Sequence, residues 1–253
     1  MNELEFYRWF AYCWISIALL VFVLLFFIQA PYGRFTREGW GPRMSSRLGW
    51  ILQEAPAVFL MLLFWWTGDR RFEMVPLVLL VMWQIHYIHR TFVFPFRLRG
   101  ERKQTTVLTV VMAIFFNLAN AYMNGRWLFF LGPHYSIHWL TDHRFLGGMF
   151  LFWTGFIINK HSDHILITLR KPGEIGYKIP NGGMFRFVTA PNYLGEIIQW
   201  AGWALACYNL GGLSFFVWTV ANLAPRAFAA HRWYHEKFHD YPANRKALLP
   251  FIA

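Results

Sequence analysis

The chain has 253 residues, of which 57% are hydrophobic, 21% aromatic and only 15% charged. Soluble domains average about half apolar and about a quarter charged residues, so this composition excludes an ordinary soluble domain. The net charge of +11 would suggest nucleic-acid binding in a soluble protein, but here the basic residues stand in short connections between apolar runs. We therefore expect membrane lipid, and no nucleic acid, as a partner of a single domain over residues 1–253.

Seven stretches approach the length of about 20 mostly apolar residues that a membrane-spanning helix needs. The first follows Glu3 and Glu5 rather than basic residues and lacks a cleavage site of small residues, so we expect a retained helix and not a signal peptide. The sequence predicts an all-α integral membrane protein, a seven-transmembrane-helix bundle. The predicted spans are residues 8–30, 49–67, 74–94, 106–123, 145–159, 191–209 and 212–230.

The basic residues of the connections fall unevenly on the two sides of such a bundle. Eighteen Lys and Arg residues stand on the side of the C-terminal tail and five on the other side, with Arg90 inside a span. Cytoplasmic loops are rich in Lys and Arg. We therefore predict a multi-pass membrane protein with the N-terminus outside and the C-terminus in the cytoplasm.

Several polar residues lie inside the predicted spans, where a charged side chain costs about 2.5–3.5 kcal/mol on insertion scales. We expect them to line one shared cavity in the cytoplasmic half of the bundle. An alternative is that a carboxylate there only neutralises Arg90 in a buried ion pair. The residues concerned are Gln53, Glu54, Tyr87, Arg90, Asn192 and Glu196.

Glu54 and Tyr87 suggest a definite chemistry. A phenol donates a hydrogen bond and rarely ionises near neutral pH, and a glutamic acid in an apolar site can stay neutral and donate as well. Two donors that converge on a carbonyl oxygen would stabilise an enolate. The alternative for Tyr87 is an ordinary aromatic residue of a helix interface.

Residues 160–190 are predicted to be a loop, with turns at Pro172-Gly173 and Gly182-Gly183. The arginines and lysines of this stretch, beside phenol and amide groups, suit a phosphorylated nucleotide, because guanidinium binds phosphate through two hydrogen bonds. A solvated basic loop on the cytoplasmic side is an equally good interpretation. Neither GxGxxG nor GxxxxGK[ST] occurs in the sequence, so a Rossmann or P-loop nucleotide site is not supported.

The ten histidines invite a metal site, but their arrangement argues against one. His235 to His239 matches HExxH formally, yet it lies in a charged tail shortly before Pro242. His134, His138 and His143 fall on the opposite side of the predicted bundle from the other histidines. With Cys13 and Cys207 each inside an apolar run, we expect no metal and no disulfide framework.

Five motifs, in order along the chain, closely resemble the steroid 5α-reductase family, including bacterial members. They are LQE (52–54), HYIHRTFVF (86–94), HSDHILITLRKPGEIGYKIPNGGMF (161–185), PNYLGEIIQW (191–200) and HDYPANRKALLPFI (239–252). The resemblance implies seven transmembrane helices and NADPH-dependent reduction of a 3-keto-4-ene steroid or related enone lipid. We expect a monomer in the bacterial inner membrane or the endoplasmic reticulum. Hydride would pass to the enone β-carbon, and the enolate would then be protonated.

The resemblance also implies roles for individual residues. Glu54 and Tyr87 match the pair that holds the 3-keto oxygen, with Gln53 beside them in the substrate site, and His89 and Trp200 would stand behind the site. The segment 101–123 aligns poorly, so no cofactor contact is transferred from it. The positions that match cofactor contacts are Arg90, Asn159, Asp163, Arg170, Tyr177, Asn192, Glu196, Arg226 and Tyr234.

Three other functions remain open from the sequence. Isoprenylcysteine carboxyl methyltransferases, which bind S-adenosylmethionine, share a similar C-terminal half, but Gln53-Glu54 and RKPGEIGYKIP fit the reductases better. A sterol sensor or transporter would explain an apolar cavity but not a loop suited to phosphate. Reductases of polyprenols or enoyl thioesters are nearer rivals, because the same pair of donors could polarise another carbonyl.

Overall fold

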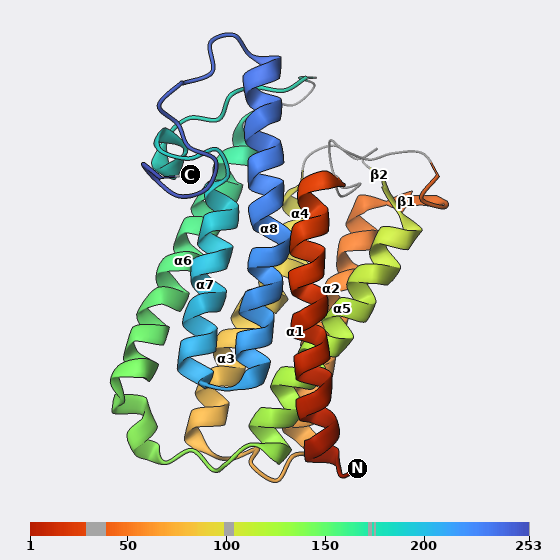
Figure 1. The fold of residues 1–253 in the computed structure, drawn as a ribbon, viewed down its shortest axis with the longest axis vertical. Helices are drawn as coiled ribbons and strands as arrows, with labels where there is room; N and C mark the ends of the chain where they lie inside the picture. The colour runs from red at the N-terminus through yellow and green to blue at the C-terminus, as the bar shows by residue number, and fades with distance from the viewer. Residues whose placement is uncertain (29–38, 99–103, 172–173, 175, 253) are drawn as a thin grey trace.

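Long α-helices run side by side along a common axis and alternate in direction, so that the two termini lie at opposite ends of the bundle (Figure 1). The computed structural model describes residues 1–28, 39–98, 104–171, 174 and 176–252. The basic residues Arg34, Arg37, Arg99, Arg102 and Lys103 and the turn predicted at Pro172-Gly173 lie outside the described residues. The helices are α1 (Glu3–Phe27), α2 (Ser46–Thr67), α3 (Met74–Ile88), α4 (Phe94–Arg97), α5 (Val107–Arg126), α6 (His143–Thr168), α7 (Pro191–Cys207) and α8 (Leu210–Lys237).

Short elements join or extend these helices. A π-helix, η2 (His89–Val93), makes α3 and α4 continuous, and a second one, η3 (Trp127–Leu131), extends α5; the 3-10 helices are η4 (Ile137–Thr141) and η5 (Gly183–Arg186). Two antiparallel strands, β1 (Arg43–Ser45) and β2 (Gln104–Thr106), directly precede α2 and α5 and tie their first turns together, with Met44 opposite Thr105. The all-α prediction omitted this ribbon because three residues are too few to show an alternating pattern.

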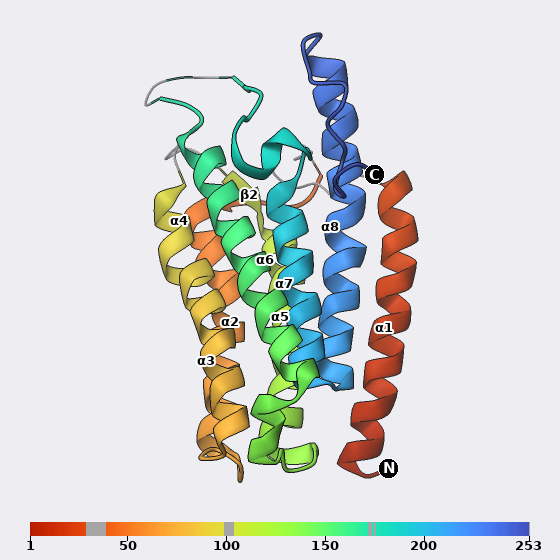
Figure 2. The ribbon, with the colours of Figure 1, turned by 90° about the vertical axis from the view of Figure 1, so that its left-hand side faces the viewer.

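Among the described residues, four helical segments are long and apolar enough to cross a membrane: Glu3–Phe27, Ser46–Thr67, Met74–Arg97 and Val107–Leu131. This confirms the helical, membrane-protein character. Helices α6, α7 and α8 run parallel to these four in both views (Figures 1 and 2) but are more polar or shorter, α7 having 17 residues. The count of seven passes and the orientation stay predictions.

Two helices extend well beyond the predicted spans. The prediction of a loop from residue 160 is wrong over its first part, because α6 remains helical to Thr168, and α8 likewise continues to Lys237 rather than ending at 230. The reason is packing: Asn159, Ser162 and Asp163 are polar but buried within the bundle, so neighbouring helices rather than hydrocarbon stabilise this end of α6. A hydropathy pattern does not register that kind of stabilisation.

Glycines bring α6 and α7 into main-chain contact, which fixes the position of the polar residues beyond them. A Cβ added at Gly155 of α6 would lie 2.4 Å from the carbonyl oxygen of Gly195 in α7, and one at Gly202 would lie 2.5 Å from the carbonyl oxygen of Gly148. Small residues permit this close approach of helices in membranes. The contact sets Asn159 directly beside Gly195.

Candidate active site

A cavity of about 1720 Å³ opens within the bundle, lined by α1, α2, α3, η2, α5, α6, α7 and α8. Ligand pockets commonly measure about 300–1,000 Å³, so this one has room for more than one ligand. Every residue that the sequence assigned to a substrate or cofactor site lines it: Gln53, Glu54, Tyr87, Arg90, Asn159, Asp163, Arg170, Tyr177, Asn192, Glu196, Arg226 and Tyr234.

Glu54 is held in the wall of the cavity by α2, where it is only 7% exposed. Its Oε1 accepts a hydrogen bond from Gln53 Nε2 at 3.2 Å and lies 3.5 Å from Nε of Arg90. Pro56 stands two residues on within the same helix, and its missing N–H removes one main-chain hydrogen bond from this turn. The carboxyl therefore projects toward the cavity and toward a guanidinium from a turn that lacks one main-chain hydrogen bond.

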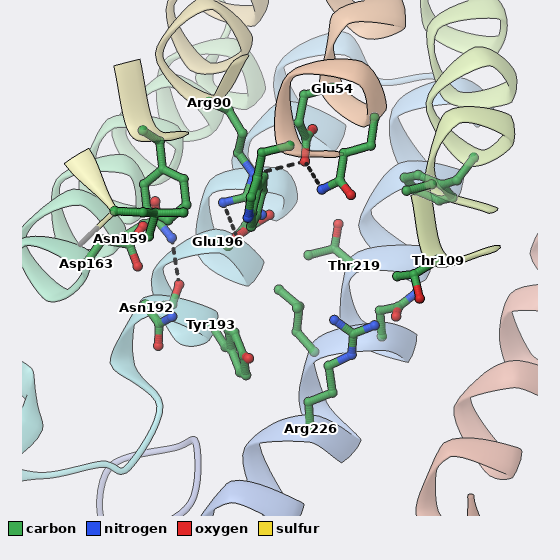
Figure 3. A pocket seen from close by; sticks show the side chains of 18 of the residues that line it. Glu54, Arg90, Thr109, Asn159, Asp163, Asn192, Tyr193, Glu196, Thr219 and Arg226 are labelled. Atoms are coloured by element: carbon green, nitrogen blue, oxygen red, sulfur yellow. Dashed lines mark hydrogen bonds and ion pairs between the residues drawn. The ribbon is translucent and has the colours of Figure 1, made fainter. Parts of the chain in front are cut away.

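Arg90 occupies the π-helix η2, an irregularity that is frequent at functional sites. Its guanidinium lies between two carboxyl groups, with Nη1 3.7 Å from Oε2 of Glu196 and Nε near Glu54 (Figure 3). It also stacks over the ring of Trp50, with 4.6 Å from Cζ to the ring centroid. The buried ion pair considered as an alternative thus exists, and it lies inside the same cavity, so the two interpretations describe one site.

Tyr87 is buried among aromatic rings and presents its hydroxyl to α5. Its ring centroid lies 4.7 Å from that of Trp83 and 6.0 Å from that of Trp200. The hydroxyl accepts a hydrogen bond from Asn120 Nδ2 at 3.2 Å and donates one to Asn117 Oδ1 at 3.4 Å. The phenol is therefore fixed by packing on one side and by amides on the other.

The sequence analysis missed the amides of α5. Asn117 contacts both sides of the site, since its Nδ2 donates to the main-chain carbonyl of Gln53 at 2.6 Å and lies 3.5 Å from Oε2 of Glu54. Asn117, Asn120 and Asn124 are all buried. Their spacing of three and four residues along an apolar span places them on one helix face, and this was the signal in the sequence that could have revealed them.

The facing wall of the cavity carries acceptors that are not used within the protein. Asn159 Nδ2 donates to the main-chain carbonyl of Asn192 at 2.9 Å (Figure 3). Among the described residues, Asn159 Oδ1 and Asp163 Oδ2 are buried without a hydrogen-bond partner. Buried polar atoms are nearly always paired, so these two are suited to donors on a ligand.

The end of the cavity near the C-terminal tail is basic and aromatic. Figure 3 shows Arg226 reaching from α8 into the same space as Glu196 and Asn192. Arg170 Nη1 donates to the carbonyl of Gly176 at 3.0 Å, and the ring of Tyr177 lies 4.8 Å from that of Trp233. Arg170 and Tyr177, which follow the end of α6, therefore lie at the mouth of the cavity.

The rest of this loop is stabilised by an ion pair and by a hydrogen bond from the C-terminal tail. Lys178 Nζ lies 2.6 Å from Oε1 of Glu174, and this hydrogen bond lowers the pKa of the Glu174 carboxyl. Gly182 and Gly183 have φ of 90° and 48°, which confirms the predicted turn there. The buried Arg245 of the C-terminal tail donates a hydrogen bond to the carbonyl of Pro180 at 3.1 Å, which links the tail to the residues just before this turn.

The histidine motif does not form the geometry of a zinc site. Helix α8 ends at Lys237, so His239 is beyond the helix and is not one turn above His235. His231 and His235 lie on α8, whereas His239 does not, so the three histidines do not form a stripe on one helix. Within the described ranges, no group of three or more His, Cys, Asp or Glu residues is placed to hold a metal ion.

Comparisons with known proteins match this chain to one family. The family model described as 3-oxo-5-alpha-steroid 4-dehydrogenase matches residues 103–253. A steroid 5-alpha-reductase DET2 of Gossypium hirsutum is 42% identical over 96% of this chain and 97% of its own length. The 3-oxo-5-alpha-steroid 4-dehydrogenase 1 of Rattus norvegicus is 44% identical over 89% of this chain and 87% of its own. A DET2 protein of Arabidopsis thaliana is 39% identical over the full length of both chains.

Proposed function

Because the chain belongs to the 3-oxo-5-alpha-steroid 4-dehydrogenase family, we propose that it reduces the 4,5 double bond of 3-keto-4-ene steroids to 5α-dihydrosteroids. The observation that carries the proposal is the single cavity that joins a buried carboxyl and phenol to a basic, aromatic mouth. Such a cavity suits an apolar ketone at one end and an anionic dinucleotide at the other. The family likewise favours reduction over methyl transfer.

NADPH is the cofactor that these residues fit. The unpaired Asn159 Oδ1 and Asp163 Oδ2 are acceptors for an amide N–H, as a nicotinamide carboxamide offers. Arg170 and Arg226 have the planar, double-donor geometry that suits phosphate, and Tyr177 and Tyr234 supply aromatic surface beside them. Arg90, Asn192 and Glu196 would complete the cofactor site. The bound cofactor would supply the hydride, and the protein would supply position and charge.

Glu54 and Tyr87 would hold the substrate's 3-keto oxygen, with Gln53 supporting the carboxyl through its hydrogen bond. When the β-carbon of the enone gains a hydride, the carbon–carbon double bond shifts and charge develops on the oxygen. Donors aimed at that oxygen stabilise the enolate more than the ketone, which lowers the barrier. Protonation of the α-carbon completes the reduction, so that one hydride and one proton are added. The surrounding tryptophans would keep water away from the reacting carbons.

We further place this cavity in the cytoplasmic half of a bundle that crosses the membrane seven times, with the N-terminus outside. The alternating helix directions support an odd number of passes (Figure 2). The basic connections then face the cytoplasm, as the positive-inside rule requires, and the mouth of the cavity opens toward soluble NADPH.

The proposal is tested with the purified full-length chain in detergent or lipid vesicles. NADPH absorbance is followed with testosterone or progesterone, with no steroid, and with a polyprenol or enoyl thioester. Steroid-dependent oxidation with a 5α-dihydro product is expected. If no 3-keto-4-ene steroid supports oxidation of NADPH, the substrate assignment is wrong. Mass spectrometry of copurified nucleotide separates NADP(H) from S-adenosylmethionine, which would indicate methyl transfer instead.

A further inference from the structure

We propose that buried amides of α5 act as positioning residues that set the direction in which the Tyr87 hydroxyl donates its proton. The inference rests on the proposed function, because it gives those amides a role in holding the ketone. The groups form one continuous row of hydrogen bonds, called here the indole-to-phenol chain. Its members, from remote to central, are Trp203, Asn124, Asn120 and Tyr87.

The remote end of the chain has only one possible polarity. The indole N–H of Trp203 can donate but not accept, and it lies 2.8 Å from Oδ1 of Asn124. The Asn124 amide must therefore turn its NH₂ away, where it donates to Oδ1 of Asn120 at 3.0 Å and to that residue's carbonyl at 2.9 Å. Asn120 in turn has only its NH₂ left for Tyr87.

Asn117, on the other side of the Tyr87 hydroxyl, leads independently to the same polarity. Asn117 Nδ2 donates to the main-chain carbonyl of Gln53 at 2.6 Å, an atom that can only accept. This leaves Oδ1 of Asn117 facing Tyr87. The phenol thus has a donor on one side, Asn120, and an acceptor on the other, Asn117, so its hydrogen must point toward Asn117. The amide nitrogen of Asn117 in turn lies 3.5 Å from Oε2 of Glu54.

The distances indicate which of these bonds a substrate would replace. The bond from Tyr87 to Asn117 is 3.4 Å long, whereas hydroxyl hydrogen bonds to oxygen are usually about 2.5–3.0 Å. It is therefore the weak bond of the row, while Asn117 stays tied to α2 through its short bond to Gln53. A ketone oxygen that approaches Glu54 can take the phenol's hydrogen without disturbing the amides that aim it.

The residues of the indole-to-phenol chain are buried, which protects their hydrogen bonds from water. Trp203, Asn124, Asn120 and Tyr87 are between 0% and 3% exposed, so bulk water does not compete for their hydrogen bonds. Without the donor from Asn120, the phenol oxygen would gain a vacant lone pair and its hydrogen could rotate to other acceptors. The expected cost is in the reaction step, because the ketone would no longer meet a pre-aligned donor.

A double-mutant cycle tests the inference with the full-length chain and a 3-keto-4-ene steroid. Asn120→Leu has nearly the shape of asparagine and removes the donated hydrogen bond. We expect it to lower kcat about tenfold in the otherwise unaltered protein, and to have no further effect in the Tyr87→Phe background, because it acts only through that hydroxyl. The KM for NADPH should stay within about twofold, a split that a general loss of structure would not give.

The matched control is Gln84→Leu. Gln84 is also a buried amide, but it donates to the main-chain carbonyl of Val58, at 3.1 Å, and not to the Tyr87 hydroxyl, which is bonded to Asn117 and Asn120. Its kcat should change by less than about twofold. If Asn120→Leu fails to fold, Trp203→Phe removes the first donor of the chain while keeping an aromatic ring, and it enters the same cycle.

Three results would overturn the inference: an Asn120→Leu enzyme with unaltered kcat, effects of the two substitutions that multiply, or an equal loss in Gln84→Leu. Failure of the proposed function looks different. In that case the protein without substitutions does not reduce the steroid at all, whereas the inference fails only in a protein that does.

Discussion

Arg90 and Glu54 form an ion pair inside the cavity, with Nε of the arginine 3.5 Å from Oε1 of the glutamate, although 36 residues separate them in sequence. The same guanidinium also lies 3.7 Å from Glu196 on α7. One cation therefore links the carboxyl proposed to meet the ketone with a carboxyl proposed to meet the cofactor. Substitutions near the ketone should therefore lower kcat more than they weaken NADPH binding, as long as Arg90 keeps its ion pair with either Glu54 or Glu196.

Replacing Glu54 by glutamine should lower kcat at least about a hundredfold, the usual effect of losing one oxyanion-stabilising group. An amide is a much weaker acid than a carboxylic acid, so its N–H stabilises the developing enolate oxygen less. NADPH binding should persist, because Glu196 still pairs with that arginine. The control is Glu73→Gln, which alters a glutamate paired with His134 at the other end of the bundle. Equal losses in both variants would count against the role of Glu54.

Tyr87→Phe should likewise reduce turnover about a hundredfold or more and leave the affinity for NADPH nearly unchanged. The substitution removes only the hydroxyl, so the packing on Trp83 and Trp200 remains. Tyr7→Phe is the matched control, because Tyr7 is also fully buried and its hydroxyl donates to the carbonyl of Met123 at 2.9 Å on another face of the bundle. Steady-state kinetics and NADPH titrations measure both. A rate close to that of the unaltered protein in Tyr87→Phe would remove the oxyanion role.

Arg170→Ala should raise the KM for NADPH about tenfold or more, in line with the loss of a hydrogen bond to a charged group. The kcat at saturating NADPH should fall much less, because Arg170 stands at the mouth of the cavity and not beside the ketone. Arg186→Ala provides the comparison: this arginine belongs to the same connection but is exposed in η5 and does not line the described cavity. An unchanged KM in Arg170→Ala would argue against a phosphate contact.

Gly155→Ala should destabilise the protein by about 1–3 kcal/mol or more, the usual cost of overpacking. The new methyl group would lie 2.3 Å from the main-chain nitrogen of Gln199 and push α7 away from α6. Gly147→Ala on the same helix meets only a methyl group of Leu205 at 3.7 Å and should be tolerated. Thermal unfolding in detergent measures the difference. Similar unfolding temperatures for both variants would show that the helix contact adapts.

The sequence was most informative where a single residue type carries chemistry. Glu54, Tyr87 and Arg90 stood out because ionisable and phenolic groups are unusual inside apolar spans, and the cavity does bring them together. The four most apolar helices could be predicted as well, because long apolar runs show directly in the composition. These features depend on residue type alone, so they can be recognised without knowing how the helices pack.

Other parts of the site depend on contacts that a single sequence does not display. Asn117 and Asn120 are neutral amides, which insertion scales mark less strongly than charges, and their meaning appears only once α5 is set against Tyr87. The end of α6 was placed too early because its polar residues are covered by protein. The close contact of Gly155 and Gly195 joins residues 40 positions apart, and no local pattern reveals such a pairing.

The most direct test of the account follows the hydrogen that reaches the steroid. The purified protein is given testosterone and NADPH carrying deuterium at both hydrogen positions of the nicotinamide C4, and the product is analysed by NMR and mass spectrometry. The account predicts a 5α-dihydro product with one deuterium at C5, the β-carbon of the enone, and an intact 3-keto group. Deuterium at C3, from reduction of the carbonyl itself, or a product without deuterium would contradict it.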